Sequence, residues 1–193
     1  LSEYQNIRQN GIIAMNIREG DELIAVIRTN GNDDILLGTH DGMSIVFHEN
    51  EVRRVGRTSF GVRGITLRDG DYVVGAYRFY HDEYVLTISE NGYGKRSAAG
   101  EYHIQGRGGM GSRAMKITEK TGKLCGILVV DGVEDVMLVN DASVIIRICS
   151  GDVSVFGRAS QGVRLMRLAD DTKVVAVAKL PAEEDEEEKT EEE

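Results

Sequence analysis

Short apolar runs separated by turn-forming residues fill most of the chain. Between residues 62 and 98, glycine, aspartate and asparagine separate four such runs, at 62–67, 72–78, 84–89 and 94–98. Asp41-Gly42 and Asn91-Gly92 each stand between apolar runs, which is a strong signal for a β-hairpin. No long segment has apolar residues at helical spacing. The pattern therefore predicts an all-β protein of short antiparallel strands.

The runs recur at a fixed interval. Similar sequences surround four glycines that are 50, 50 and 51 residues apart: Gly11, Gly61, Gly111 and Gly162. Four antiparallel strands in a repeat of this length are typical of propeller blades. We therefore expect residues 1–181 to form one domain, with units opening near these glycines. About three and a half units are present, which we interpret as part of a larger ring.

The charge of the chain is unevenly distributed. The net charge is −9, but residues 183–193 carry nine acids and one lysine. Residues 1–181 are therefore close to neutral, with a net charge of −1. A block of like charges cannot bury a core, so we expect residues 182–193 to be a disordered acidic tail.

Within the repeats, basic and acidic segments alternate in phase with the units. Residues 42–68 have a net charge of +3, residues 91–116 of +4 and residues 140–167 of +2, while the segments between them are negative. Equivalent positions of a propeller lie at equivalent places on each blade, so this phasing predicts a basic band. Such a band suits duplex DNA bound through its phosphates, with bending as the main product. An ordinary mixed-charge surface remains the alternative.

A glycine-rich loop, "QGRGGMG", raises a second possibility. Its residues are Gln105, Gly106, Arg107, Gly108, Gly109, Met110 and Gly111. Gly106, Gly108 and Gly111 form G-x-G-x-x-G, the dinucleotide-binding fingerprint. That fingerprint must open a helix, but a short strand and a turn are expected next. We therefore expect no nucleotide cofactor. The two cysteines and four histidines have no metal-ligand spacing, so we also expect no metal. We assign no catalytic residue in this domain.

Several motifs together resemble the C-terminal domain of the DNA gyrase A subunit. They are "SENGYGKRSAAGEYHIQGRGGMG", "VRRVGRTSFGVRGI" and "VFGRASQGVRLMRL", and they occur in order through residues 1–181. The family's defining loop, the gyrase box Q-R-R-G-G-K-G, belongs to a first blade that is absent here. Gln105–Gly111 matches it at five of seven positions, with Gly106 and Met110 departing. We interpret this loop as a degenerate copy in a later blade.

The resemblance implies a fold, a role and partners. The fold is a β-pinwheel, a propeller relative whose blades exchange strands. The role is to bend or wrap DNA for an ATP-dependent type II topoisomerase that introduces negative supercoils. The partners are duplex DNA, the rest of the gyrase A subunit, and the gyrase B subunit in a heterotetramer. ATP and magnesium are bound elsewhere in that enzyme, and the location is cytoplasmic, associated with the chromosome.

Basic residues in or beside the repeated loops are the candidate DNA contacts. They are Arg53, Arg54, Arg57, Arg63, Lys95, Arg96, Arg107, Arg113, Arg158 and Arg164. Three of them, Arg57, Arg107 and Arg158, occupy one position of the repeat and could instead brace their turns. Arg54 and Arg63 could pair with Glu49 or Glu51.

Two other functions fit the same pattern. The A subunit of topoisomerase IV resembles that of gyrase in fold but has degraded boxes, whereas "ENGYGKR" and "QGRGG" are well kept here. A propeller that serves as a protein-interaction platform would instead present an exposed apolar patch.

Overall fold

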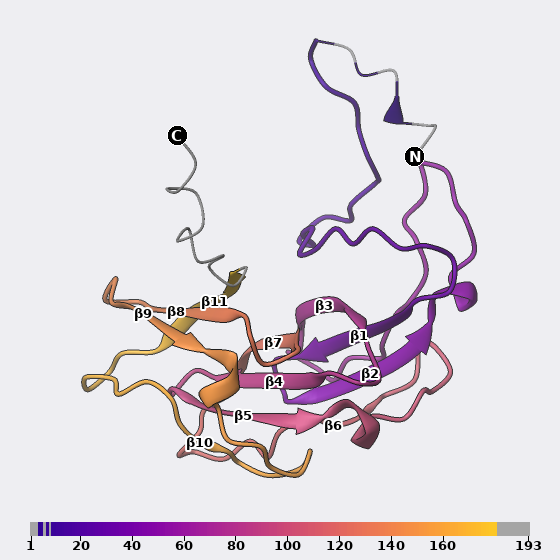
Figure 1. Ribbon diagram of the computed structural model, residues 1–193. Coiled ribbons are helices and arrows are strands. Elements are labelled where there is room, and N and C mark those ends of the chain that lie inside the picture. Colours follow the sequence, from indigo (N-terminus) through magenta and orange to yellow (C-terminus); the bar gives the residue numbers. More distant parts are fainter. Residues whose placement is uncertain (1–3, 6, 8, 181–193) are drawn as a thin grey trace, which may run out of the picture.

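The described part of the protein consists of β-strands and loops with three short 3-10 helices (Figure 1). The computed structural model describes residues 4, 5, 7 and 9–180. Its strands are β1 Asp34–Thr39, β2 Met43–His48, β3 Val73–Phe79, β4 Tyr84–Ser89, β5 Tyr93–Ala98, β6 Ser112–Arg113, β7 Leu124–Val130, β8 Asp135–Asn140, β9 Ile145–Cys149, β10 Val163–Arg164 and β11 Val174–Leu180. The 3-10 helices are η2 Glu49–Glu51, η3 Ala99–Glu101 and η4 Ser150–Asp152. The all-β prediction is confirmed.

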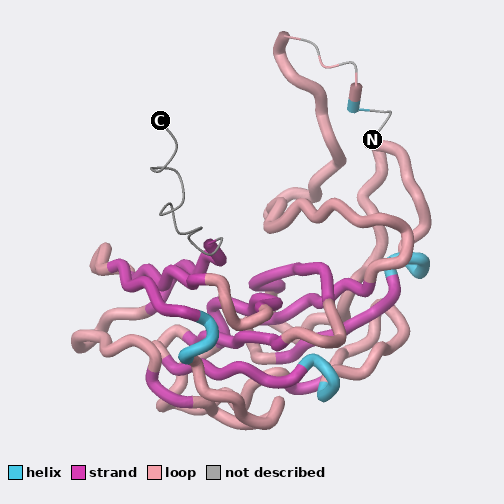
Figure 2. Tube along the Cα trace, in the orientation of Figure 1, coloured by secondary structure: helices cyan, strands magenta, loops and turns pink. Residues whose placement is uncertain are grey.

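The strands form three antiparallel sheets, in the orders β3-β1-β2-β6, β10-β5-β4-β7 and β11-β8-β9. The central pairs β1-β2, β4-β5 and β8-β9 are hairpins that turn at residues 40–42, 90–92 and 141–144. The first two turns are those that Asp41-Gly42 and Asn91-Gly92 predicted. Each hairpin leads into one of the 3-10 helices, and long loops connect these to the following unit (Figure 2). Each of the first three sequence repeats therefore contains one β-hairpin.

Each sheet is completed by strands from later units. The hairpin β1-β2 lies in the unit that opens at Gly11, but its neighbour β3 comes from the next unit and β6 from the one after. The second sheet has the same arrangement, with β7 and β10 added to β4-β5. Successive units are thus joined by backbone hydrogen bonds, the strand exchange that characterises a pinwheel.

One expected strand does not form. Residues 62–67 are a loop in the structure, although the equivalent segments of the next two units include β6 and β10. These strands pair with a hairpin two units earlier. Residues 62–67 make no such strand pairing in the described part of the chain. Residues 23–29, equivalent to β3, likewise form no strand.

The inner strands β3, β7 and β11 bring neighbouring sheets together, and the short strands β6 and β10 lie at the opposite, outer edge. Between β7 and β11 the approach is close: a Cβ atom on Gly126 would lie 2.7 Å from the Val177 side chain. Buried apolar residues fill the spaces between sheets, with Leu36 and Ile127 in one cluster and Leu86 and Leu138 in another. Packing between blades therefore forms the core.

Some expectations are not addressed by this fold. The acidic tail lies outside the described residues, so its expected disorder stays a prediction. In the described part of the chain, no helix is long and apolar enough to cross a membrane.

Candidate nucleic-acid interface

The outer edge carries an exposed arginine at the same place in three successive units. Arg113 lies in β6 and Arg164 in β10, the outermost strands of their sheets. Arg63 stands at the equivalent position of the preceding unit, and all three side chains are exposed. Arg164 also donates a hydrogen bond from Nη2 to the Tyr93 hydroxyl, 2.9 Å away, and this contact lowers the pKa of Tyr93. The fold thus converts a Gly-x-Arg repeat into a row of exposed guanidinium groups.

Two further basic residues extend this row, and sequence reasoning did not select them. Lys116 and Arg167 each lie three residues after an outer arginine, and both are exposed. The signal was present in the aligned segments "SRAMK" and "VRLMR". We name Arg63, Arg113, Arg164, Lys116 and Arg167 together the outer basic row.

The second repeated set, Arg57, Arg107 and Arg158, has a different placement. These side chains are half-buried and point to backbone carbonyls near the start of their own unit. Arg57 donates to Ile13 O at 2.8 Å, Arg107 to Arg63 O, and Arg158 to Arg113 O at 2.5 Å. The bracing role that the sequence left open therefore exists at all three positions.

Carboxylates fix the same loops from the other side. The backbone N–H of Arg107 donates to Glu51 Oε2 and that of Arg158 to Glu101 Oε2, each at 2.7 Å. Glu51 ends η2 and Glu101 ends η3, so these two 3-10 helices each anchor the arginine loop of the next unit. The guanidinium of Arg158 also lies 5.8 Å from the ring centre of the buried Tyr102. These contacts give the loops a defined conformation.

The glycine-rich loop Gln105–Gly111 belongs to this arrangement. Gln105 N–H donates to Val46 O at 2.7 Å, and Gly108 N–H donates to Gly64 O at 2.8 Å. The backbone of Gly111 has a φ of 71°, and the strand β6 follows it directly. The loop therefore lacks the helix that a dinucleotide site requires.

The remaining glycines of this loop differ in their contacts. Gly109, which keeps the gyrase-box pattern, is exposed, and its carbonyl accepts the Thr66 N–H at 2.8 Å. The Thr66 hydroxyl donates to Gly108 O at 2.7 Å, so two carbonyls of the loop are held by a residue near the start of the same unit. Gly106 and Met110, which depart from the box pattern, are both exposed. Gly108 and Gly109 thus fix the loop to Thr66, a structural role that the box-like pattern alone did not predict.

Two candidate contacts are placed inside the protein. Lys95 has 0% exposed surface, which excludes it as a direct contact in this conformation. Arg96 is half-buried and donates to the carbonyls of Val153 and Gly151, at 2.8 and 2.7 Å, while its guanidinium packs on Tyr84. Both were selected because they are basic and near a turn, but they lie in β5, which later units cover on its outer side.

Arg53 and Arg54 are exposed in the loop after η2. The expected pairing of Arg54 or Arg63 with Glu49 or Glu51 is not found in the described residues. Glu49 instead accepts backbone N–H groups of Gly31 and Asp33, and these contacts, with a hydrogen bond to Thr29, lower its pKa. The acids are thus used to hold turns, which leaves these arginines available at the surface.

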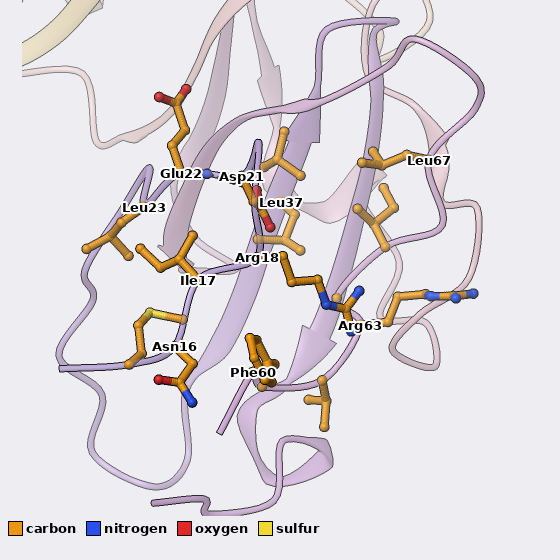
Figure 3. Close-up of a pocket in the computed structure, with 16 residues that line it drawn as sticks. Asn16, Ile17, Arg18, Asp21, Glu22, Leu23, Leu37, Phe60, Arg63 and Leu67 are labelled. Atoms are coloured by element: carbon orange, nitrogen blue, oxygen red, sulfur yellow. Dashed lines mark hydrogen bonds between the residues drawn. The ribbon is translucent and has the colours of Figure 1, made fainter. Parts of the chain in front are cut away.

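A pocket of about 470 Å³ lies between the segment 15–23 and the loop 60–67 (Figure 3). Its lining includes Phe60, Arg18 and Leu37. The glycine-rich loop does not contribute to its lining. Within the described residues no group of three or more histidine, cysteine or acidic side chains could hold a metal ion.

Comparison with known proteins identifies the family. The family model described as "DNA gyrase C-terminal domain, beta-propeller" matches residues 1–30, 33–79, 83–131 and 134–181. The chain belongs to the DNA gyrase C-terminal domain family. The DNA gyrase A subunit of Staphylococcus aureus (strain MRSA252) is 50% identical over 190 residues, covering 97% of this chain and 21% of the relative. The same protein of Staphylococcus epidermidis (strain ATCC 12228) is 50% identical over 188 residues, covering 96% and 21%. The chain thus spans about a fifth of the length of these relatives.

Solved structures agree with the family and the fold. A DNA gyrase A C-terminal domain superposes with a TM-score of 0.78 at 27% identity, covering 89% of this chain and 58% of that domain. A C-terminal domain of DNA topoisomerase IV superposes with a TM-score of 0.88 at 26% identity, covering 94% and 57%. The β-pinwheel expectation is therefore confirmed, and the described sheets are blades of a gyrase C-terminal domain.

Proposed function

We propose that the outer basic row binds the phosphate backbone of duplex DNA and bends it along the edge of the gyrase C-terminal domain. The observation that carries this is the recurrence of an exposed arginine, Arg63, Arg113 and Arg164, at one position of three successive units. A guanidinium fork matches phosphate geometry, and neighbouring positive charges add to the attraction. Arg53 and Arg54 are further contacts of the same kind. Arg57, Arg107 and Arg158 contribute mainly by holding the loops.

Binding of this kind depends on the shape and flexibility of the DNA duplex rather than on its base sequence. Bending a short duplex costs on the order of 1–6 kcal/mol, and contacts spread over several blades offset that cost. Because the contacts are ionic, the affinity falls with salt in proportion to the number of phosphates neutralised. The repeated spacing of the blades then sets the direction in which the duplex curves.

The chain acts as a non-catalytic part of DNA gyrase, an ATP-dependent type II topoisomerase. In this proposal it presents a DNA segment to the cleavage gate formed by the rest of the A subunit, while the B subunit completes the heterotetramer. ATP and magnesium are bound by those other parts, and the enzyme works on the chromosome in the cytoplasm. The acidic tail competes with DNA for the basic band, and deleting residues 182–193 should then raise the affinity.

A role in topoisomerase IV is the second candidate, and one observation favours it. The topoisomerase IV domain superposes with the higher TM-score, 0.88 against 0.78. The sequence favours gyrase, because the gyrase relative is 50% identical over nearly the whole chain while the topoisomerase IV domain is 26% identical. Sequence distinguishes relatives that share a fold, so gyrase is the first choice.

A salt series tests the proposal. Duplex DNA affinity of the chain is measured by fluorescence anisotropy, beside a variant with Arg63, Arg113 and Arg164 changed to alanine. The slope of log K against log salt should fall by about two to three units in this variant. A control variant removes the same charge from Lys123, Lys173 and Lys179, which pair with acids at other sites. Equal slopes in the two variants, or no salt-dependent binding, would contradict the proposal.

A further inference from the structure

A lysine is completely buried beside the outer edge of the second sheet. Lys95 lies in β5 with 0% exposed surface, and it is the largest fully buried side chain of the described residues. Its Nζ donates to Ser97 Oγ at 2.6 Å, Arg158 O at 2.9 Å and Ala114 O at 3.0 Å. The equivalent positions of the neighbouring units hold Ile45 and Ile146. The position therefore accepts an apolar residue elsewhere in the repeat, and its charge is particular to this unit.

The three acceptors belong to two successive units. Ser97 is in the same strand as Lys95. Ala114, which directly follows the exposed Arg113 of β6, and the bracing residue Arg158 both belong to the unit that opens at Gly111. Arg158 in turn donates to the carbonyl of Arg113. One ammonium group thus joins the backbone segment that presents Arg113 to the loop that braces it.

Keeping a charge at this place is costly to the fold. Burial lowers the pKa of Lys95 to about 8, Glu101 opposes that shift, and the positive charge of Arg158 adds to it. Burial also raises the pKa of Tyr102, which is buried under the guanidinium of Arg158. A buried ionic group is often replaceable by an apolar one without loss of stability. Side-chain packing alone therefore does not explain why a lysine, rather than an apolar residue, occupies this position.

We propose that Lys95 is a positioning residue that holds the Arg113 strand and the Arg158 loop in the arrangement that meets DNA. The inference rests on the proposed DNA-binding function. Lys95 itself contacts no phosphate. Lys95 restricts the motion of these two segments in the free protein. Less conformational entropy is then lost when DNA binds, so the affinity rises without an additional contact.

Salt dependence separates positioning from direct contact. In the 193-residue chain, Lys95→Met should weaken duplex DNA binding about fivefold at fixed salt. The slope of log K against log salt should stay as in the wild type, because no phosphate contact is lost. The matched control is Lys116→Met, an exposed lysine of the same region, which should lower that slope by about one. If Lys95→Met does not fold, Lys95→Ile replaces it, since isoleucine occupies the equivalent positions.

Two further measurements report on the position itself. Amide hydrogen exchange at residues 112–116 and 156–160 should be faster in Lys95→Met than in the wild type, and unchanged in Lys116→Met. Wild-type affinity should fall between about pH 7 and 9 as Lys95 loses its proton, whereas Lys95→Met should show no such fall. Glu101 and Arg158 are the charged groups that face Lys95, and both are present in the wild type and in Lys95→Met, so the comparison isolates the lysine.

The outcomes are distinct. Wild-type affinity, exchange and pH profile in Lys95→Met would overturn the inference while leaving the proposed function intact. A salt slope lowered as in Lys116→Met would make Lys95 a direct contact and would also overturn it. If the wild-type chain shows no salt-dependent DNA binding, the proposed function fails, and faster exchange in Lys95→Met would then describe a structural clamp only.

Discussion

The guanidinium of Arg158 donates a hydrogen bond to the backbone carbonyl of Arg113, 2.5 Å away, so one arginine holds the strand on which another is displayed. Arg107 makes the same contact with the carbonyl of Arg63 one unit earlier. The bracing residue is half-buried in each pair and the displayed residue is exposed. Two arginines of one repeat therefore have separate tasks, which single substitutions can distinguish.

The first prediction concerns this division. Arg158→Ala should lower the free energy of unfolding by about 1 kcal/mol, because a charged donor to a backbone carbonyl is lost. Its salt slope for DNA should match that of the wild type. Arg113→Ala should change stability by less than about 0.5 kcal/mol and lower the slope by about one. Urea denaturation and anisotropy titrations measure both quantities, and the reverse pattern would mean that Arg158 is the phosphate contact.

The second prediction concerns the glycine that closes the box-like loop. Gly111 and Gly61 have nearly the same φ, 71° and 77°, but a Cβ on Gly111 would lie 2.3 Å from Ser44 O while nothing lies within 4 Å at Gly61. In both alanine variants a residue with a Cβ must adopt a positive φ, which costs about 1–2 kcal/mol. Gly111→Ala adds a clash with backbone that cannot move aside, which should cost about 1–3 kcal/mol more. Urea midpoints give the comparison, and equal losses would show that the Ser44 backbone yields.

Hairpins were predictable from the sequence because their strands are neighbours and their turns are marked. Asp41-Gly42 and Asn91-Gly92 located two of them directly. The exchange of strands came only from the family resemblance, since local patterning does not say which unit supplies a partner. The loop at 62–67 shows the limit: its residues resemble β6 and β10, yet it pairs with no hairpin in the described residues.

The candidate interface was predictable in part for a similar reason. Counting arginines in the repeated loops found Arg63, Arg113 and Arg164, which the fold exposes. Charge by itself also selected Lys95, because a lysine in a polar stretch is usually exposed. Its burial depends on contacts from residues 19 and 63 positions later, at Ala114 and Arg158. Local sequence carries no signal of such contacts.

The third prediction concerns acid stability. Burial of the Glu134 carboxyl opposes ionisation, but side-chain hydrogen bonds with Asp131 and Lys179 outweigh it and lower its pKa to about 2. The stabilisation is present above the ordinary pKa near 4.5 and is lost as the pH falls from there towards 2. Glu134→Gln should therefore be less stable than the wild type at about pH 6, and the gap should close at low pH. Urea denaturation from about pH 6 to 2.5 measures this, and a constant gap would contradict it.

The fourth prediction concerns alkaline stability and Lys95. Its pKa in the folded chain is about 8, below the ordinary value of 10.5. Between these values the unfolded chain holds a proton that the folded chain has released, so the free energy of unfolding rises with pH. The wild type should gain stability relative to Lys95→Met as the pH increases from about 8 to 10.5. Comparing the two chains cancels the other lysines and tyrosines that titrate in the same range. Urea denaturation at about pH 7.5, 8.5 and 9.5 provides the test, and parallel curves would show that Lys95 keeps its proton in the folded chain.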